Sequence, residues 1–453
     1  MMPTMLMNAQ MHQRPRREAP RGLLSRLAGN RLVRNNAIFF GGSVAAGALG
    51  YVFHFAIGRL LGPAPYSIVA SAVAAVYLLT LPSLIVQLIA ARFTSVAAAR
   101  GEAGSLIPLL RLLTGTSVAL GVVVALAFWV GGSRVAGFLQ LSDRRVVAVL
   151  ALSTLLGMLV ATNRGLLQGL RRFGTLSLNL AIDGFTKVVV AVTLVLAGLG
   201  PLGAVVGILA GPVVAYLQAL AVVGRLSAGP GKRVLFGEVA RYAAPAAAAV
   251  IGVTYLFNID VVLARHFLPA TQAGIYAAGS VLGRAVYFLG LTVAAVMFPE
   301  VASRHARDQA HFHVVDLSLA FLAAVGAVLI VVYAVLPGLV LLPYGNQFTP
   351  VRPFLARFAA ALTLLALSNL LVNYFLSVNS KRFIPPLLAA GVVETVLMAL
   401  FHRDLGQLLG MLLLTTTLLT LSLSGLYLLD RFGAQVGAGA APDGTPFAES
   451  SPV

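Results

Sequence analysis

Seven ionisable residues lie within or close to long apolar stretches of this chain. Four are basic and three are acidic: His54, Arg164, Lys187 and Arg284, and Asp183, Asp260 and Glu394. A charge at the centre of a bilayer costs about 2.5–3.5 kcal/mol on insertion scales, so such residues usually face a cavity or a partner. Arginine suits a phosphate because its planar guanidinium makes paired hydrogen bonds to phosphate oxygens. The basic residues are therefore the candidate phosphate-binding groups, and the carboxylates are candidate coupling or structural groups.

Three of the basic residues also have structural interpretations. Asp183 and Lys187 are four residues apart on one predicted helix face, so they can neutralise each other. Arg164 lies near the end of its apolar stretch, where an arginine can instead contact lipid headgroups. His54 can be a hydrogen-bonded packing residue. For these residues the binding role and the structural role both stay open.

Arg284 is the deepest of the arginines. It lies eleven residues into its stretch, roughly 16 Å at 1.5 Å per residue, and Glu394 lies at a similar depth. Arg284 can therefore bind a ligand or pair with Glu394 or Asp260. Asp260 lies closer to the end of its stretch, where it can cap or brace a helix.

No signature of metal or nucleotide chemistry accompanies these residues. The chain has no cysteine, and its seven histidines show no HExxH spacing. It also lacks a Walker A sequence. We therefore predict that the protein has no metal site, needs no cofactor and is not an enzyme.

The apolar stretches themselves predict an all-α polytopic membrane protein. Hydrophobic residues make up 59% of the chain and charged residues only 10%, against about 25% charged in an ordinary soluble domain. The stretches are long enough for bilayer-spanning helices and too long for β-barrel strands. We predict about twelve transmembrane helices, near residues 36–60, 66–91, 106–131, 146–170, 175–198, 201–224, 243–264, 273–298, 314–336, 353–377, 383–401 and 405–429.

The positive charges predict the orientation. Most of the basic residues outside the spans fall on the side of the amino-terminal tail, and the opposite side holds only Arg59, Arg134, Arg144, Arg145, Arg265, Arg352 and Arg403. Because basic loops stay cytoplasmic, both termini are expected to be cytoplasmic. The basic residues are scattered over short loops, so the +18 net charge indicates contact with membrane lipids and no nucleic-acid partner.

The spans divide into two sets of six around the longest internal loop. AIGRLLGPAPYSIVASAVA at 56–74 has the same local order as VLARHFLPATQAGIYAAGSVL at 262–282, and Arg59 precedes Pro63 at the spacing by which Arg265 precedes Pro269. The pattern suggests two parallel repeats flanking a central cleft. The predicted units are a basic cytoplasmic tail, a six-helix bundle, a cytoplasmic linker, a second six-helix bundle and a disordered cytoplasmic tail, at 1–35, 36–224, 225–242, 243–429 and 430–453.

Four segments resemble the Wzx-type oligosaccharide flippases, polysaccharide biosynthesis membrane proteins of the superfamily that also holds MATE exporters and MurJ (MOP). They are RGLLQGLRRFG at 164–174, NIDVVLARHFLPATQAGIYAAGSVLGRAVYF at 258–288, LLGPAPY at 60–66 and VMFPEVAS at 296–303. Pro65 departs from the family pattern, which more usually has an acidic residue there. The similarity extends over nearly all of 36–429.

The resemblance implies a flippase that moves a polyprenyl-diphosphate-linked oligosaccharide across the membrane by alternating access. It also implies a polysaccharide polymerase or glycosyltransferases as candidate partners. The alternative is a MATE-like, cation-coupled exporter of drugs or metabolites. An exporter of that kind would use Asp183, Asp260 or Glu394 as its coupling carboxylate.

Overall fold

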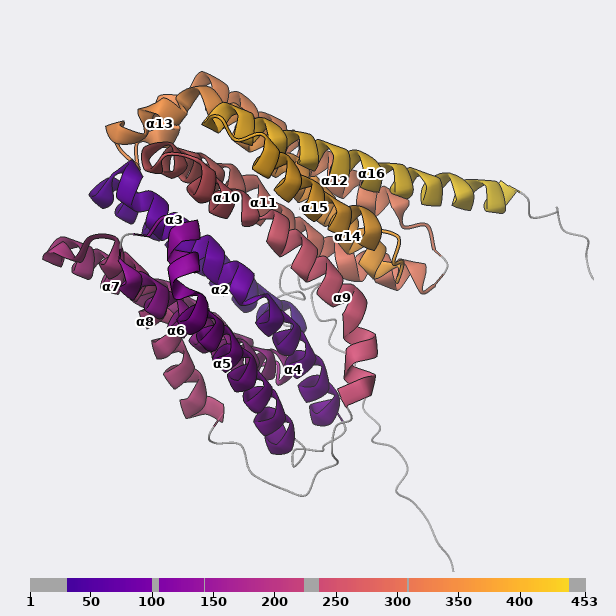
Figure 1. Cartoon of the computed structure of the whole chain (residues 1–453). Coiled ribbons are helices and arrows are strands. Elements are labelled where there is room, and N and C mark those ends of the chain that lie inside the picture. The colour runs from indigo at the N-terminus through magenta and orange to yellow at the C-terminus, as the bar shows by residue number, and fades with distance from the viewer. Residues whose placement is uncertain (1–30, 100–105, 142, 224–235, 308, 440–453) are drawn as a thin grey trace, which may run out of the picture.

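A computed structural model describes residues 31–99, 106–141, 143–223, 236–307 and 309–439 (Figure 1). Every regular element within these ranges is a helix, and none of the described residues forms a strand. The predicted all-α class is confirmed. Of the predicted tails at 1–35 and 430–453, residues 1–30 and 440–453 lie outside the described residues, as does most of the predicted linker. Residues 31–35 and 430–439 are helical, so the disorder expected from residue 430 onward is wrong for 430–439.

Helices α2 to α8 form an N-terminal group. Their bounds are α2 (Arg31–Leu61), α3 (Pro63–Leu79), α4 (Leu81–Ala99), α5 (Leu106–Phe138), α6 (Arg144–Gly169), α7 (Phe173–Leu194) and α8 (Gly200–Val223). The C-terminal group comprises α9 (Phe236–Leu256), α10 (Ile259–Phe267), α11 (Ala270–His305), α12 (Phe312–Val335), α13 (Pro337–Leu341), the 3-10 helix η3 (Asn346–Phe354), α14 (Leu355–Ser377), α15 (Ile384–Leu400) and α16 (Leu405–Gly439).

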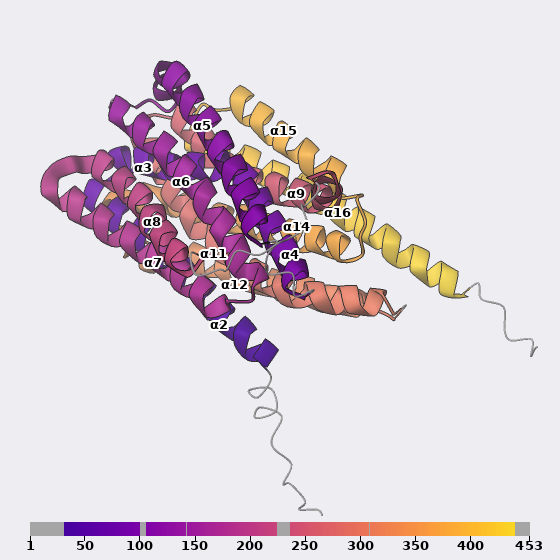
Figure 2. The ribbon, with the colours of Figure 1, turned by 90° about the horizontal axis from the view of Figure 1, so that it is seen from below.

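Each group packs mainly within itself. In the N-terminal group α6 packs on α4, α5 and α8, and α7 packs on α2 and α8. In the C-terminal group α14 packs on α11, α12 and α16. Helix α3 joins the groups, because it packs on α10 and α11 (Figures 1 and 2). We call the end of the molecule that carries the α2–α3 and α10–α11 connections the distal end; the described termini lie at the other end.

The structure contains ten segments long and apolar enough to cross a membrane, counted over the described residues. Two features account for the difference from twelve. Helices α7 and α8 count as one 51-residue segment, although the chain reverses between them at Gly198 (φ 89°) and Gly200 (φ 53°). Both glycines have positive φ, which costs little without a Cβ. Helix α15 is apolar but has only 17 residues. Separating the first pair and adding α15 gives the twelve predicted crossings.

Two predicted spans are broken rather than continuous. The span predicted at 66–91 divides at Thr80 into α3 and α4, just before Pro82. The span predicted at 243–264 divides at Phe257 and Asn258 into α9 and α10. The Asn258 side chain donates a hydrogen bond to the Thr254 carbonyl at 2.9 Å, which takes the place of regular helical bonding there. This second break lies near the middle of the apolar segment Pro245–Phe267.

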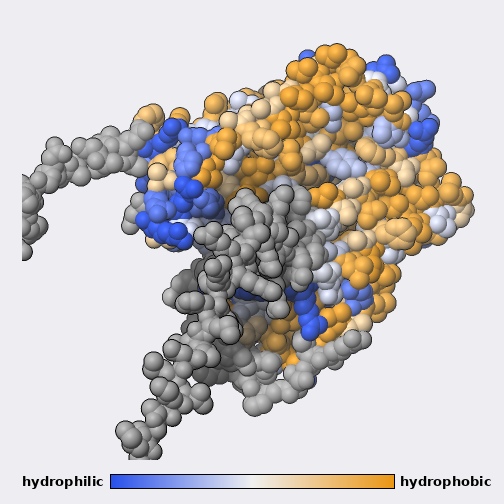
Figure 3. All heavy atoms as spheres, turned by 180° about the vertical axis from the view of Figure 1, so that it is seen from behind, coloured by the Kyte–Doolittle hydropathy of each residue, from blue (hydrophilic) through white to orange (hydrophobic). Residues whose placement is uncertain are grey.

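The surface between the two ends is predominantly apolar (Figure 3). Large apolar side chains such as Val130, Val296 and Leu317 are 71–80% exposed there. An exposed apolar surface this extensive is stable in lipid and not in water. The chain is a multi-pass membrane protein.

Glycines of the RGLLQGLRRFG segment allow α6 to approach α4 closely. A Cβ built at Gly165 would lie 2.6 Å from the Ala90 Cβ, and one at Gly169 would lie 2.5 Å from the Thr94 Cβ. The two glycines are four residues apart and so share one helix face, as in small-residue helix contacts in membranes. This part of the family-like segment therefore has a packing role.

The Gly165→Ala substitution is expected to destabilise the protein by about 1–3 kcal/mol, the usual range for overpacking. The matched control is Gly174→Ala in the same segment, because a Cβ at Gly174 meets nothing within 4 Å. Thermal denaturation of the purified protein compares the two. Equal melting temperatures for both variants would contradict the close α4–α6 contact.

Candidate functional site

The N-terminal group contains a partly buried ion pair between α6 and α7. Arg164 Nη2 lies 2.6 Å from Asp183 Oδ2, and Arg164 Nε donates to Asn179 Oδ1 at 2.8 Å. Asn179 in turn donates to the Ala215 carbonyl and to Gln218 Oε1 on α8, both at 2.7 Å. The partner of Asp183 is therefore Arg164, and no ion pair joins Asp183 to Lys187. Both members of the pair keep about a fifth of their side chains exposed (17% and 21%).

Lys187 has no such partner. It lies near the middle of α7, and it makes neither an ion pair nor a hydrogen bond with any residue that the structure describes. Its Nζ lies 5.1 Å from the centroid of the Phe53 ring on α2, within range of a cation–π interaction. The side chain is only half-buried. This lysine of an apolar helix therefore has no hydrogen-bond or ion-pair partner among the described residues that would compete with a ligand.

His54 connects this lysine to the other helix group. Its Nδ1 lies 3.0 Å from the Tyr66 hydroxyl, which lies 3.0 Å from the hydroxyl of Tyr344, between α13 and η3. Lys187 and Arg284 are the two cations whose charges act on the His54 ring. The structure thus brings His54, Lys187 and Arg284 into one neighbourhood, from α2, α7 and α11. Arg164 belongs to the separate pair with Asp183.

Arg284 lies at the break between α9 and α10. Its Nη2 donates to the Phe257 carbonyl at 2.6 Å, and its guanidinium carbon lies 4.3 Å from the Phe257 ring centroid. The end of a helix leaves carbonyls without backbone donors, and Arg284 supplies one. Nη2 is also 3.8 Å from Asp260 Oδ1. Asp260 lies in the first turn of α10, where the helix dipole favours a negative charge.

Glu394 is fully buried on α15, yet neither of its carboxylate oxygens has a hydrogen-bond partner among the described residues. Asp260 Oδ1, Arg284 Nε and the Tyr276 hydroxyl are likewise buried without a hydrogen-bond partner among the described residues. Asp260 and Glu394 both act electrostatically on Tyr276. We call Asp260, Tyr276, Arg284 and Glu394 the C-terminal polar cluster. Glu394 is not the ion-pair partner of Arg284; Asp260 is nearer to it.

A second set of polar contacts joins the two groups at the distal end. Arg265 of α10 donates to the carbonyls of Leu139 at 3.0 Å and Gln140 at 2.6 Å, just after α5. It also donates to Ser67 Oγ of α3 at 2.9 Å. Arg265 is only 4% exposed. These bonds tie the C-terminal group to the N-terminal group.

Arg59 makes a corresponding bond in the opposite direction. Its Nη1 donates to the Leu342 carbonyl, just after α13, at 3.2 Å. Arg59 and Arg265 are the equivalent arginines of the repeated sequence pattern. Each arginine donates to a backbone carbonyl of the opposite helix group. In both cases the acceptor follows the third predicted span of that opposite group: Leu139 after 106–131 and Leu342 after 314–336. We call these two arginines and their acceptors the arginine latch.

The sequence patterns did not indicate the roles of Tyr66, Tyr276 and Tyr344. Tyrosine is common in membrane helices, so residue type alone carries no signal there. No cluster of three or more His, Asp or Glu side chains that could hold a metal ion exists within the described ranges.

Comparison with known proteins identifies the family and the fold. The family model for polysaccharide biosynthesis proteins matches residues 32–305, which is more than half of the chain. A search of curated proteins gave no match.

Three solved structures illustrate the fold. The inward-facing conformation of a multidrug resistance MATE family transporter of the MOP superfamily has a TM-score of 0.72 and 12% identity, over 86% of this chain and 96% of that one. The lipid II flippase MurJ, in an inward closed conformation, has a TM-score of 0.66 and 12% identity, over 85% and 86%. The outward-facing conformation of a MATE transporter has a TM-score of 0.59 and 12% identity, over 92% and 98%.

These findings agree with the geometry of the molecule. The matched structures are those of membrane transporters and a lipid flippase, and they cover both helix groups of this chain. The chain has the fold of these transporter structures and belongs to the polysaccharide biosynthesis protein family.

Proposed function

We propose that this protein moves a polyprenyl-diphosphate-linked oligosaccharide from the inner to the outer leaflet of the bacterial plasma membrane, for surface polysaccharide biosynthesis. The observation that carries the proposal is Lys187, a half-buried cation near the middle of α7 without a partner among the described residues. The family match to polysaccharide biosynthesis proteins supports the substrate class. MurJ, with a related fold, is a lipid II flippase.

The chemistry of this substrate requires the features that the site provides. The polyprenyl chain can remain in the bilayer, but the diphosphate and the sugars cannot cross hydrocarbon without a polar path. In our proposal Lys187 binds a phosphate oxygen, Arg284 contributes positive potential from a neighbouring helix, and His54 offers a ring N–H as a hydrogen-bond donor. Arg164 could join them only by releasing Asp183. No covalent bond is made or broken.

Alternating access would use the two helix groups as rigid halves. We propose that residues 36–224 and 243–429 are the repeats that rock against each other, joined by the 225–242 linker. With cytoplasmic termini, the distal end faces outward and the arginine latch closes the outer side. The higher TM-score of the inward-facing MATE structure than of the outward-facing one supports this closed state. A polysaccharide polymerase or glycosyltransferases are the proposed partners.

A second candidate is a cation-coupled exporter, and Glu394 is the observation that favours it. A fully buried carboxyl group without a hydrogen-bond donor is stabilised by taking up a proton or a small cation. Such a group would also serve as the coupling site of a flippase. Glu394 therefore concerns the ion that would drive transport and does not distinguish between the two substrates. A direct test of the substrate is needed.

Depleting the protein in its native cell is expected to remove surface polysaccharide. Lipid-linked repeat units should then accumulate in the cytoplasmic leaflet, because their synthesis continues while their headgroups cannot cross. Quantifying the lipid-linked sugars and the surface polymer measures both effects. Normal surface polymer together with increased sensitivity to toxic cations would instead identify the exporter.

A further inference from the structure

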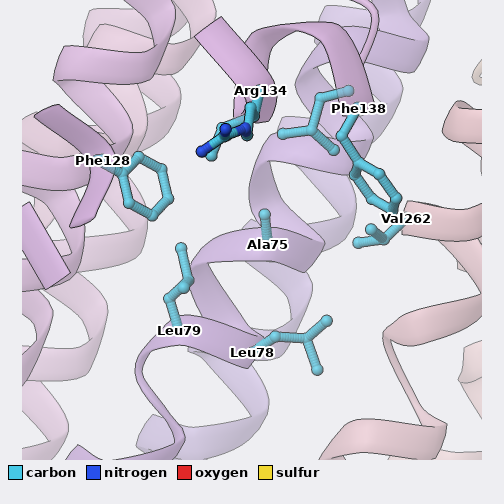
Figure 4. A pocket seen from close by; sticks show the side chains of 9 residues that line it. Ala75, Leu78, Leu79, Phe128, Arg134, Phe138 and Val262 are labelled. Atoms are coloured by element: carbon cyan, nitrogen blue, oxygen red, sulfur yellow. The ribbon is translucent and has the colours of Figure 1, made fainter. Parts of the chain in front are cut away.

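A pocket of about 390 Å³ lies between the two helix groups near the distal end (Figure 4). Its walls are apolar except for one arginine, and its main side chains are Leu78 and Leu79 of α3, Phe128, Arg134 and Phe138 of α5, and Val262 of α10. Helix α5 lies on the outside of the N-terminal group (Figure 2). The pocket is open rather than enclosed, so it is accessible from the surrounding membrane.

Arg134 is the only charged residue of this pocket. It makes neither a hydrogen bond nor an ion pair with any residue in the described part of the chain. Figure 4 shows its guanidinium over the pocket, on the side of Phe128. Arg134 lies one turn before the end of α5 and beyond the candidate membrane span Leu106–Phe128. The pocket thus combines an apolar interior with one free cation near its upper edge.

We propose that this pocket binds one acyl chain of an anionic phospholipid, whose phosphate accepts hydrogen bonds from Arg134. An apolar pocket excludes a free phosphate as the whole ligand, and an unpaired guanidinium favours a negatively charged headgroup over a zwitterionic one. The bilayer supplies such lipids at high local concentration. The single positive charge of Arg134 balances the single negative charge of an anionic phospholipid headgroup. It would balance only about half of the negative charge of a diphosphate.

The position of the pocket links this lipid to the closed state of the distal end. Val262 belongs to the C-terminal group, whereas the other lining residues belong to the N-terminal group. Leu139, which also lines the pocket, accepts a hydrogen bond from Arg265 through its carbonyl. Phe138 stacks on His266 at 4.1 Å between ring centroids. Separating the two groups would dismantle the pocket, so a bound lipid favours the closed arginine latch.

Native mass spectrometry of the full-length protein tests the site, with phosphatidylglycerol and phosphatidylethanolamine as probes in equal amounts. The unmodified protein should retain phosphatidylglycerol preferentially. In Arg134→Gln this preference should fall about tenfold or more, because the phosphate loses its charge-assisted hydrogen bonds from the guanidinium. Arg134→Lys should keep most of the preference, which distinguishes loss of charge from misfolding. Leu79→Trp should reduce retention of both lipids by filling the pocket.

The control is Arg144→Gln, which removes an exposed arginine at the same end of the molecule. Arg144 lies outside the pocket and makes no hydrogen bond or ion pair among the described residues. This variant should behave like the unmodified protein. An unchanged preference in Arg134→Gln, an equal loss in Arg144→Gln, or unchanged retention in Leu79→Trp would overturn the proposal. Displacement of phosphatidylglycerol by equimolar polyprenyl phosphate, with the same dependence on Arg134, would overturn the assignment to a phospholipid. The test measures lipid retention alone, so its outcome is independent of the transported substrate.

Discussion

The Lys187→Met substitution is expected to abolish most of the export of lipid-linked oligosaccharide while leaving the protein folded. Lys187 is the cation without a partner in the described interior, so its loss leaves no carboxylate unpaired. Methionine has a similar length and packs well in apolar surroundings. Removing one charged contact to a phosphate should lower the transport rate about tenfold to a hundredfold, corresponding to about 1.5–3 kcal/mol.

The measurement is a leaflet assay in proteoliposomes, in which lipid-linked oligosaccharide that has crossed becomes accessible to an added glycosidase. Lys187→Arg should retain much of the rate, because it keeps the positive charge. Lys381→Met is the matched control: Lys381 is an exposed lysine at the opposite end from the latch, and it should transport normally. Normal transport by a well-folded Lys187→Met protein would exclude Lys187 from substrate binding.

Arg284 is a less selective test of substrate binding than its depth in the sequence suggested. It is 7% exposed, and it donates to the Phe257 carbonyl at the break between α9 and α10. Replacing it with alanine would leave that carbonyl and Asp260 without their nearest positive group. A loss of export in Arg284→Ala would therefore combine a structural effect with any loss of substrate contact. Lys187 separates the two effects because, among the described residues, it makes no hydrogen bond or ion pair, and its contact with the Phe53 ring is a weak one.

The crossing helices were predictable because each needs only a long apolar run, and the reversal between α7 and α8 lies where the predicted spans 175–198 and 201–224 meet. The break at Phe257 and Asn258 was not predictable. No proline or glycine marks it, and the structure there depends on two hydrogen bonds, from Asn258 to Thr254 and from Arg284 on α11. The second bond joins residues far apart in the sequence. Local patterns therefore predicted the existence of this span but not its interruption.

The partners of the buried charges were predictable only as alternatives. Asp183 has Lys187 one helical turn away, which is the local solution. The structure instead pairs Asp183 with Arg164 on α6. Asn179, on α7 like Asp183, provides a further acceptor for the guanidinium. The choice depends on how α6 and α7 pack, which residue types alone do not specify. Glu394 shows the same limit, because its isolation from donors follows from the packing of α15.

The repeated arginines were visible in the sequence, but their function was not. Equal spacing from Arg59 to Pro63 and from Arg265 to Pro269 indicated equivalent turns in the two halves. Their acceptors are backbone carbonyls of the other half, which every residue type carries. A reciprocal contact of this kind leaves no side-chain signature. The contact depends on how the two halves pack against each other in three dimensions.

The Arg265→Ala substitution is expected to open the distal end. It leaves the carbonyls of Leu139 and Gln140 without their donor and removes the bond to Ser67. Each of these bonds contributes about 0.5–1.5 kcal/mol, so their combined loss should raise the open population by a factor of about ten or more. Arg59→Ala should have a smaller effect, because Arg59 makes one longer and more exposed bond. Export should fall in both variants, because a distal end that does not close cannot reset for the next substrate.

A thiol-accessibility experiment measures this opening directly, because the chain has no native cysteine. Ala70→Cys places a thiol on α3, one turn from Ser67, at a position that is 3% exposed in the closed state. A membrane-impermeant maleimide added outside intact cells should label this thiol slowly, and about tenfold or more faster when Arg265→Ala is also present. Arg145→Ala is the control, since Arg145 pairs only with the neighbouring Asp143 at the same end and does not bridge the halves. Equally slow labelling with and without Arg265 would show that the latch does not hold the distal end closed. Labelling only from the cytoplasmic side would show that the distal end faces inward and would reverse the orientation derived from the positive charges.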